Sequence, residues 1–399
     1  MRKKIVFFYL YRIFSRMYFH VPMLFVYFYT VGLSVWEIEL LLAVYGITLI
    51  FAPKFTKKFK NQNKQQITLI VGEMIKAFGL ICFVVTKDVW ILAIGQILSG
   101  LGYSLTAGTD SSLLRKLSDT YEEDKYEYKA VEAKSNSYMF ISFLVAGVLG
   151  SVIFKIDPRL VFLLSIFANM LSLISARLIN DTSEITETKI ATVIETVSDE
   201  ERLVNDKTIF FWKNYYALSR AFTLATFVGF LPYYFFIVVD VNLYYFSAIL
   251  SLFNLFGFLS SRVIVKLEKS WGYKKLTVVT SCLLIVGLMV FCFSNNLLIS
   301  VINISLLGLA SGGVRPITMA NINKKEMNNF QRTKILSSME QNYGFWNALL
   351  LLSGGLILTF FGFKTLMVSF VLMYLILILL FYKKSFKLQM PKDLSNLSN

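Results

Sequence analysis

The segment "YRIFSRMYFHVP", residues 11–22, places three ionisable side chains at spacings of four residues in an apolar, aromatic stretch. Arg12, Arg16 and His20 would share one face of a continuous α-helix, because positions i, i+4 and i+8 drift by only about 40° per step. Charged side chains inside a membrane helix cost free energy, so each is a candidate functional group. Arginine recognises anions without releasing its proton, whereas histidine can exchange one. The segment therefore predicts an anion-binding or proton-handling site.

A second interpretation gives these residues no functional role. If the membrane begins near Met17, Arg12 and Arg16 lie at the headgroup level, where long basic side chains snorkel to the interface. Residues 17–36 are long enough to span a bilayer without them. His20 would then be a packed polar residue. Against this interpretation, "IVFFYLY" would be left in water or along the membrane surface.

Acidic residues at comparable depth could neutralise the arginines. At a rise of about 1.5 Å per residue, Glu73 lies about 10 Å into its apolar run and Asp110 about 7 Å from the end of its own. We therefore expect Arg12 and Arg16 to cluster with Asp110 or Glu73 near one membrane face.

The second half of the chain offers a similar set. Glu340 could neutralise Arg220 or Arg315, or it could be an acid in the first turn of a helix, where the helix dipole favours it. Proton coupling would need a carboxylate or a histidine that responds to its surroundings. The candidates for that role are Glu73, Asp110, Glu340 and His20.

Neutral polar and aromatic side chains complete the candidate set. Tyr138, Tyr233 and Asn342 are of the types that line cavities for amphiphilic molecules. Each could equally be a packing or lipid-facing residue.

The composition identifies the elements that must position these residues. Of the 399 residues, 56% are hydrophobic and only 16% are charged, which is too apolar for a water-soluble domain of this size. Apolar runs of about 20 residues recur, and stretches such as "LLIVGLMVFCF" lack the alternation of barrel strands. The sequence predicts an all-α polytopic membrane protein.

The net charge is +15, and the lysines and arginines that produce it lie in short loops rather than on one soluble face. No nucleic-acid partner is therefore expected. The three cysteines lie in apolar runs without the spacing of a metal site or a disulfide framework. We expect no metal and no cofactor.

The apolar windows predict about twelve spans. They are 8–31, 36–53, 67–86, 89–114, 136–155, 159–179, 210–238, 243–266, 275–294, 297–318, 338–361 and 364–382. An even number puts both termini on one side, and the basic loops on that side make it cytoplasmic, because Lys and Arg resist translocation. Glu37 and Glu39 fall in a connection on the opposite side.

A polar, mostly acidic loop at the midpoint predicts two halves. They are a six-helix bundle at 1–180, a linker at 181–208, a second bundle at 209–383 and a cytoplasmic tail at 384–399. An offset of about 208 residues aligns the spans of the two halves and sets Arg12 opposite Arg220.

Two six-span halves with inside termini and a midpoint loop resemble the major facilitator superfamily of secondary transporters. "SGLGYSLTAGTDSSLLRKL" is similar to the fourth span of its bacterial efflux members, and "GGVRPITMANINKKEMNNFQRTKILSS" to the tenth span and the following loop. The resemblance implies alternating access about a central site and proton-coupled export of a drug or metabolite across a bacterial cell membrane. It also implies a monomer in membrane lipid, with a small-molecule substrate and no enzymatic activity.

The family's Gly-x-x-x-Asp-Arg-x-Gly-Arg-Lys signature after the second span is missing from "APKFTKKFKNQNKQ". The corresponding loop of the second half keeps part of it. The resemblance therefore implies a conformational charge latch in that half only, made by Arg262, Glu268, Gly272, Lys274 and Lys275.

Other functions stay open. Buried arginines would favour an organic anion, a peptide or a lipid-like molecule as the transported substrate. A membrane scaffold or signalling protein is an alternative of another class. An enzyme is not expected, because the chain has one histidine and neither HExxH nor Gly-x-Ser-x-Gly.

Overall fold

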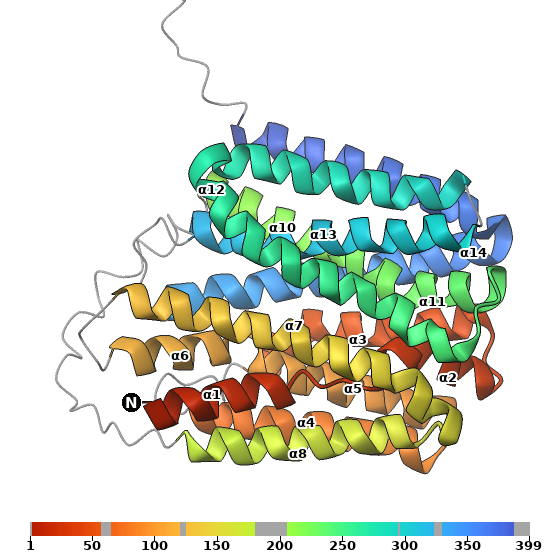
Figure 1. Ribbon diagram of the computed structural model, residues 1–399, viewed down its shortest axis with the longest axis horizontal. Helices are drawn as coiled ribbons and strands as arrows, with labels where there is room; N and C mark the ends of the chain where they lie inside the picture. The colour runs from red at the N-terminus through yellow and green to blue at the C-terminus, as the bar shows by residue number, and fades with distance from the viewer. Residues whose placement is uncertain are drawn as a thin grey trace, which may run out of the picture.

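The computed structural model describes residues 2–56, 65–119, 125–179, 206–293, 296–322 and 329–386. Every regular element in these ranges is a helix (Figure 1). We call residues 2–179 the first half and residues 206–386 the second half. The helices of the first half are α1 Arg2–Phe14, η1 Val21–Met23, α2 Leu24–Thr30, α3 Val35–Thr56, α4 Gln65–Val85, α5 Val89–Thr106, α6 Thr109–Asp119, α7 Lys125–Ile156 and α8 Leu160–Leu178.

The second half continues the all-helical pattern. Its helices are α10 Lys207–Ala225, η3 Thr226–Phe230, α11 Leu231–Tyr233, η4 Tyr234–Val238, α12 Leu243–Phe293, α13 Leu297–Ile322 and α14 Asn329–Phe386. η3 and η4 are π-helical turns. Residues 181–205 of the expected linker (181–208) and 387–399 of the expected tail (384–399) lie outside the described residues. The division into two bundles at the expected boundaries stays a prediction.

Two of the helices fold back on themselves at a glycine. Gly272 in α12 and Gly362 in α14 have φ angles of 69° and 79°, which glycine adopts without steric cost. Within the described residues, ten helical segments are long and apolar enough to cross a membrane, and one of them, Lys334–Ser385, runs through the turn at Gly362. The expected all-α polytopic fold is confirmed.

The first predicted span is not one helix. α1 ends at Phe14, and helical structure resumes only at η1. Pro22 has no N–H, so it cannot donate the backbone hydrogen bond that would continue an α-helix through this segment. The backbone N–H of Phe19 instead donates to Ser165 Oγ of α8 at 3.1 Å. The expectation that Arg12, Arg16 and His20 share a helical face is therefore wrong, because only Arg12 lies in a helix.

The two halves meet along two pairs of helices, α3 with α14 and α7 with α12. Small residues let α3 and α14 approach closely. A Cβ atom on Gly46 would lie 2.9 Å from the backbone oxygen of Gly344. The halves thus approach closely at the backbone near the middle of α3 and near the middle of the part of α14 that precedes Gly362.

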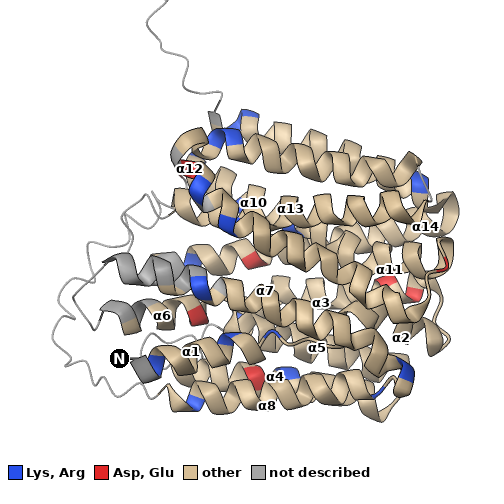
Figure 2. Cartoon of the chain, in the orientation of Figure 1, with Lys and Arg blue, Asp and Glu red and all other residues tan. Residues whose placement is uncertain are grey.

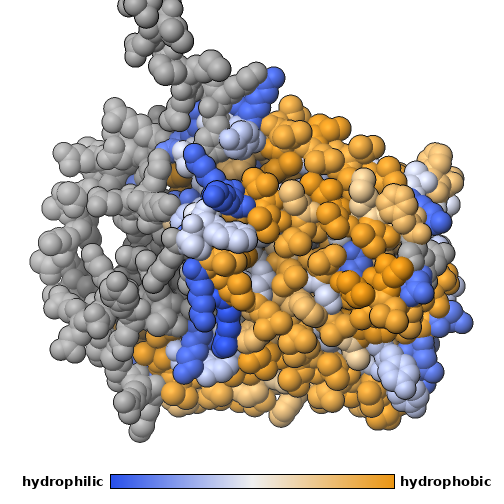
Figure 3. Space-filling view, turned by 45° about the horizontal axis from the view of Figure 1, so that its top comes forward, coloured by the Kyte–Doolittle hydropathy of each residue, from blue (hydrophilic) through white to orange (hydrophobic). Residues whose placement is uncertain are grey.

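Charge and hydropathy divide the surface into zones. Figure 2 shows lysine and arginine gathered at the end of the molecule where α1 begins and α14 ends. We call this the terminal end. Figure 3 shows a broad apolar surface between hydrophilic side chains at both ends, as expected for a protein that lies in a bilayer. That the terminal end faces the cytoplasm stays a prediction.

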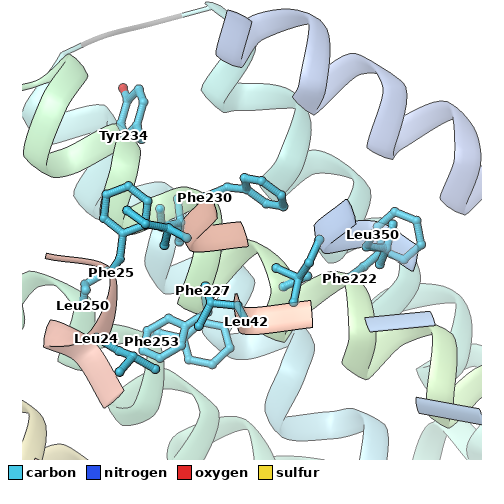
Figure 4. Close-up of a cluster of buried hydrophobic side chains, with 14 of the residues drawn as sticks. Leu24, Phe25, Leu42, Phe222, Phe227, Phe230, Tyr234, Leu250, Phe253 and Leu350 are labelled. Carbon is cyan, nitrogen blue, oxygen red and sulfur yellow. The ribbon is translucent and has the colours of Figure 1, made fainter. Parts of the chain in front are cut away.

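The opposite end, which carries residues 31–34, 86–88 and 239–242, is the distal end. Aromatic rings of the two halves meet there. Phe25 and Tyr233 have ring centroids 6.3 Å apart, and Tyr29 and Phe236 5.9 Å apart. Figure 4 shows the apolar cluster to which Phe25 belongs, with side chains from α2, α3, α10, η3, η4, α12 and α14. Contacts between the halves therefore close the distal end.

Candidate functional site

A cavity of about 310 Å³ lies between the two halves. Its volume is within the range of small-molecule sites. The broken segment after α1 lines it with Arg16, Tyr18 and His20. Irregular backbone at membrane depth is tolerated where it is buried in protein or lines a cavity. The break in the first span therefore brings polar side chains to the centre of the molecule.

A charged network forms one wall of the cavity. Arg220 of α10 lies 2.7 Å from Glu340 Oε1 of α14. Tyr216 donates to the same carboxylate at 2.9 Å and also accepts from Arg220. The ring of Tyr343 lies under the guanidinium, 4.4 Å from centroid to Cζ. The expected pairing of Glu340 with Arg220 is present in the structure.

Tyr103 of α5 joins this network from the other half. Its hydroxyl accepts from Arg220 Nη2 at 2.7 Å and donates to Glu340 Oε2 at 3.2 Å. The guanidinium of Arg16 lies over the same ring at 5.3 Å. A single tyrosine thus links the charged groups of the first half to those of the second.

Lys76 is a cavity residue that the sequence analysis missed. It is buried in α4, and its Nζ lies 2.7 Å from Glu73 Oε2 and 3.3 Å from the hydroxyl of Tyr18. Tyr11 donates to the other oxygen of Glu73 at 3.2 Å. The signal was present as "EMIK", two opposite charges three residues apart in an apolar run.

Arg12 and Asp110 form the other expected ion pair, with Nη1 2.7 Å from Oδ2. Arg12 also donates to Ser111 Oγ at 3.3 Å and is fully buried. It is enclosed by protein, so the snorkelling interpretation is wrong for this residue. Neither Arg12 nor Asp110 lines the cavity, and the pair instead joins α1 to α6.

His20 and Arg315 both line the cavity. His20 Nδ1 lies 2.9 Å from Ser165 Oγ, the same hydroxyl that accepts from Phe19. The imidazole stacks on Phe162 with centroids 5.6 Å apart. His20 is therefore a packed polar residue on the cavity wall.

Three neutral candidates do not line the cavity. Tyr138 packs edge-on against Tyr9 of α1, with ring centroids 5.4 Å apart. Tyr233 belongs to the aromatic contacts at the distal end. Asn342 donates to Asn214 Oδ1 at 3.3 Å. Their positions favour packing within or between helices.

The proposed latch residues lie around the turn in α12. Gly272 makes that turn, and Arg262 donates to Ser137 Oγ of α7 across the two halves at 3.3 Å. Lys274 and Lys275 are exposed, and Glu268 is half-buried. In the described residues, Arg262 is the one member of this set with a hydrogen bond to the other half.

Glu39 lies where the sequence analysis did not expect it. Instead of occupying a connection, it is in the second turn of α3 and is fully buried. Hydropathy cannot show this, because a lone acid near the end of an apolar run looks like a boundary residue.

The cavity wall is electropositive. Arg16, Lys76, Arg220 and Arg315 line it, and the described lining residues include no aspartate or glutamate. Lys76 pairs with Glu73, and Arg220 pairs with Glu340. Aromatic and amide side chains make up much of the remaining wall. An electropositive, aromatic cavity can hold a planar organic molecule with an acidic group.

Comparison with known proteins agrees with the all-helical membrane fold. The family model for the Major Facilitator Superfamily matches residues 5–325, while no curated protein sequence matches the chain. Solved structures of the nucleoside transporter NupG and of a mutant of it superpose with TM-scores of 0.70 and 0.72. Both are 14% identical to this chain, and the alignments cover 96% of it and 99% of them. The chain belongs to the Major Facilitator Superfamily of secondary transporters.

Proposed function

We propose that this transporter exports a small organic molecule bearing an acidic group, in exchange for protons, by alternating access of one central cavity. The observation that carries the proposal is that four cationic side chains, and no aspartate or glutamate, are among the described residues that line the cavity. Arginines retain their charge and bind carboxylates or phosphates through several donors. An anionic group therefore suits the cavity better than a cationic one.

Arg16 is the cation we assign to the substrate's acidic group. Its Nε is buried and has no hydrogen-bond partner in the described part of the chain. A buried donor without a partner costs free energy. A carboxylate in the cavity would satisfy it, with the ring of Tyr103 stacked beside the guanidinium.

Two amides on the cavity wall could recognise a heterocycle or hydroxyl groups. Gln96 Nε2 and both amide atoms of Asn169 are buried without partners in the described residues. These atoms support a second candidate, a nucleoside, the substrate class named for NupG.

A binding measurement separates the two candidates. Purified protein in lipid nanodiscs would be titrated with aromatic carboxylates, with their uncharged amides, and with nucleosides. We expect the carboxylates to bind at least about tenfold more tightly than the amides, and Arg16→Gln to remove this difference. Lys87→Gln, which changes an exposed lysine at the distal end, is the control. Equal affinity for acid and amide would contradict the anion proposal, and binding of nucleosides alone would favour the second candidate.

A flux measurement tests the direction of transport and its coupling to protons. Proteoliposomes loaded with the best-binding carboxylate should release it faster when the external side is more acidic. A release rate that does not depend on the pH gradient would contradict proton exchange. It would not contradict the proposed substrate class.

A further inference from the structure

Glu39 is a buried carboxyl group without an ion-pair or hydrogen-bond partner in the described part of the chain. It lies in α3 at the interface between the halves, and neither of its carboxyl oxygens has a hydrogen-bond partner in the described residues. A Cβ atom on Gly229 of η3 would lie 2.6 Å from Oε2 and 3.0 Å from Oε1. A Cβ on Gly355 of α14 would lie 2.9 Å from the Cβ of Glu39. Glycines of the second half thus form the pocket that receives this side chain.

The surroundings of this pocket are uncharged. Residues 226–230 of η3 and 347–359 of α14 contain no ionisable side chain. In the other elements packed on α3, the ionisable groups are Tyr27 and Tyr29 of α2 and Tyr103 of α5. Tyr27 donates to the backbone oxygen of Phe83, and Tyr103 belongs to the Arg220 network. Glu37, on α3 itself, is exposed and accepts hydrogen bonds from Ser34.

An ionised carboxylate in such a pocket would have neither a counter-ion nor a donor. Burying an unpaired charge costs more free energy than taking up a proton, so the group is buried in its neutral form. The conformation with the distal end closed therefore contains Glu39 as a neutral acid. Separation of η3 and α14 from α3 would expose the carboxyl to water, where it can ionise.

We propose that Glu39 is a proton-binding site whose protonation permits the distal end to close. In the open conformation the carboxylate accepts one proton from water, and the neutral side chain then enters the pocket beside Gly229. The reverse movement returns that proton to water. Deprotonation holds the halves apart at this end, because the charged group cannot be buried.

This site differs from the acids that the sequence suggested for coupling. Asp110, Glu73 and Glu340 each have a basic partner at 2.7 Å, whereas Glu39 has none in the described residues. The inference rests on the proposed alternating access and assigns a residue to the closing of the distal end. It does not depend on the substrate class.

The test measures the opening of the distal end directly. Cys82, Cys282 and Cys292 would be replaced by serine, and spin labels placed at Lys87 and Asn242, which are exposed on the distal end of the two halves. Double electron–electron resonance would then record the distance between labels from about pH 5 to about pH 9 in nanodiscs without substrate. We expect the long-distance population to increase with pH, because a deprotonated Glu39 opposes closure.

Variants of Glu39 and Glu37 test whether Glu39 is the group that causes the pH response. Glu39→Gln and Glu39→Met are uncharged and should keep the short distance at every pH, with loss of the pH response. Glu37→Gln removes an exposed acid two residues earlier on α3 and should respond like the parent protein. A parent protein without a pH response would overturn the inference, as would a response that survives in both Glu39 variants. A failure of carboxylates to bind would overturn the proposed substrate class but would not affect the inference about Glu39.

Discussion

At the residue scale, the two arginine–acid pairs have different surroundings. Arg12 and Asp110 are enclosed between α1 and α6. The side chains of Arg220 and Glu340 are 22% and 17% exposed and line or adjoin the cavity. The first pair therefore holds helices together, and the second is placed to respond to substrate.

This difference predicts unequal effects on stability. Asp110→Asn leaves the buried Arg12 without a counter-ion and should lower the free energy of unfolding by about 3–5 kcal/mol. Glu340→Gln should cost less, because water can reach Arg220. Unfolding in detergent micelles measures both. Replacing Arg12 and Asp110 together by leucine should recover much of the loss, whereas an unchanged stability of Asp110→Asn would contradict the structural role of the pair.

At the element scale, the break between α1 and η1 positions the site. The break turns Arg16, Tyr18 and His20 toward the cavity, and one hydroxyl from α8 contacts the broken segment at two positions. Ser165 Oγ accepts from Phe19 N–H and contacts His20 Nδ1. The broken segment is thus held in place by a contact distant in sequence.

Removing that contact should destabilise the protein. Ser165→Ala leaves the Phe19 N–H buried without an acceptor, which costs about 1–3 kcal/mol. Ser175→Ala is the matched control on the same helix, because the hydroxyl of Ser175 bonds to the carbonyl of Leu171 one turn earlier. Thermal unfolding should show a lower midpoint for Ser165→Ala than for Ser175→Ala. Equal midpoints would mean that the hydroxyl does not support the break.

At the scale of the whole molecule, the apolar surface and the basic terminal end define how the protein lies in a membrane (Figures 2 and 3). Lysine and arginine resist translocation, so the terminal end should face the cytoplasm. The distal end, with its aromatic contacts between the halves, should then face outward.

Cysteine labelling checks this orientation. In a background without the three native cysteines, a cysteine at Lys87 should react with a membrane-impermeant maleimide in intact cells. A cysteine at Lys275 should react only after the cells are opened. Both positions are exposed, so the reverse pattern would show that the charge rule fails for this chain.

The sequence alone determined where most of the helices lie and which charged residues were candidates to pair. Spans follow from hydropathy because each must match the thickness of the bilayer. The pairs Arg12–Asp110 and Arg220–Glu340 were among the predicted alternatives because few charges exist inside the spans, and each needs a partner there. These are properties of single segments and of composition, which need no knowledge of the fold.

Only the tertiary structure decided which side chains reach the cavity and which are buried between the halves. Ser165 lies 146 residues from Phe19, yet it supports the break in the first span. Glu39 is buried because Gly229 and Gly355 of the other half leave room for it. Burial of a polar group depends on which faces of distant helices meet. Local patterns in the sequence do not contain that information.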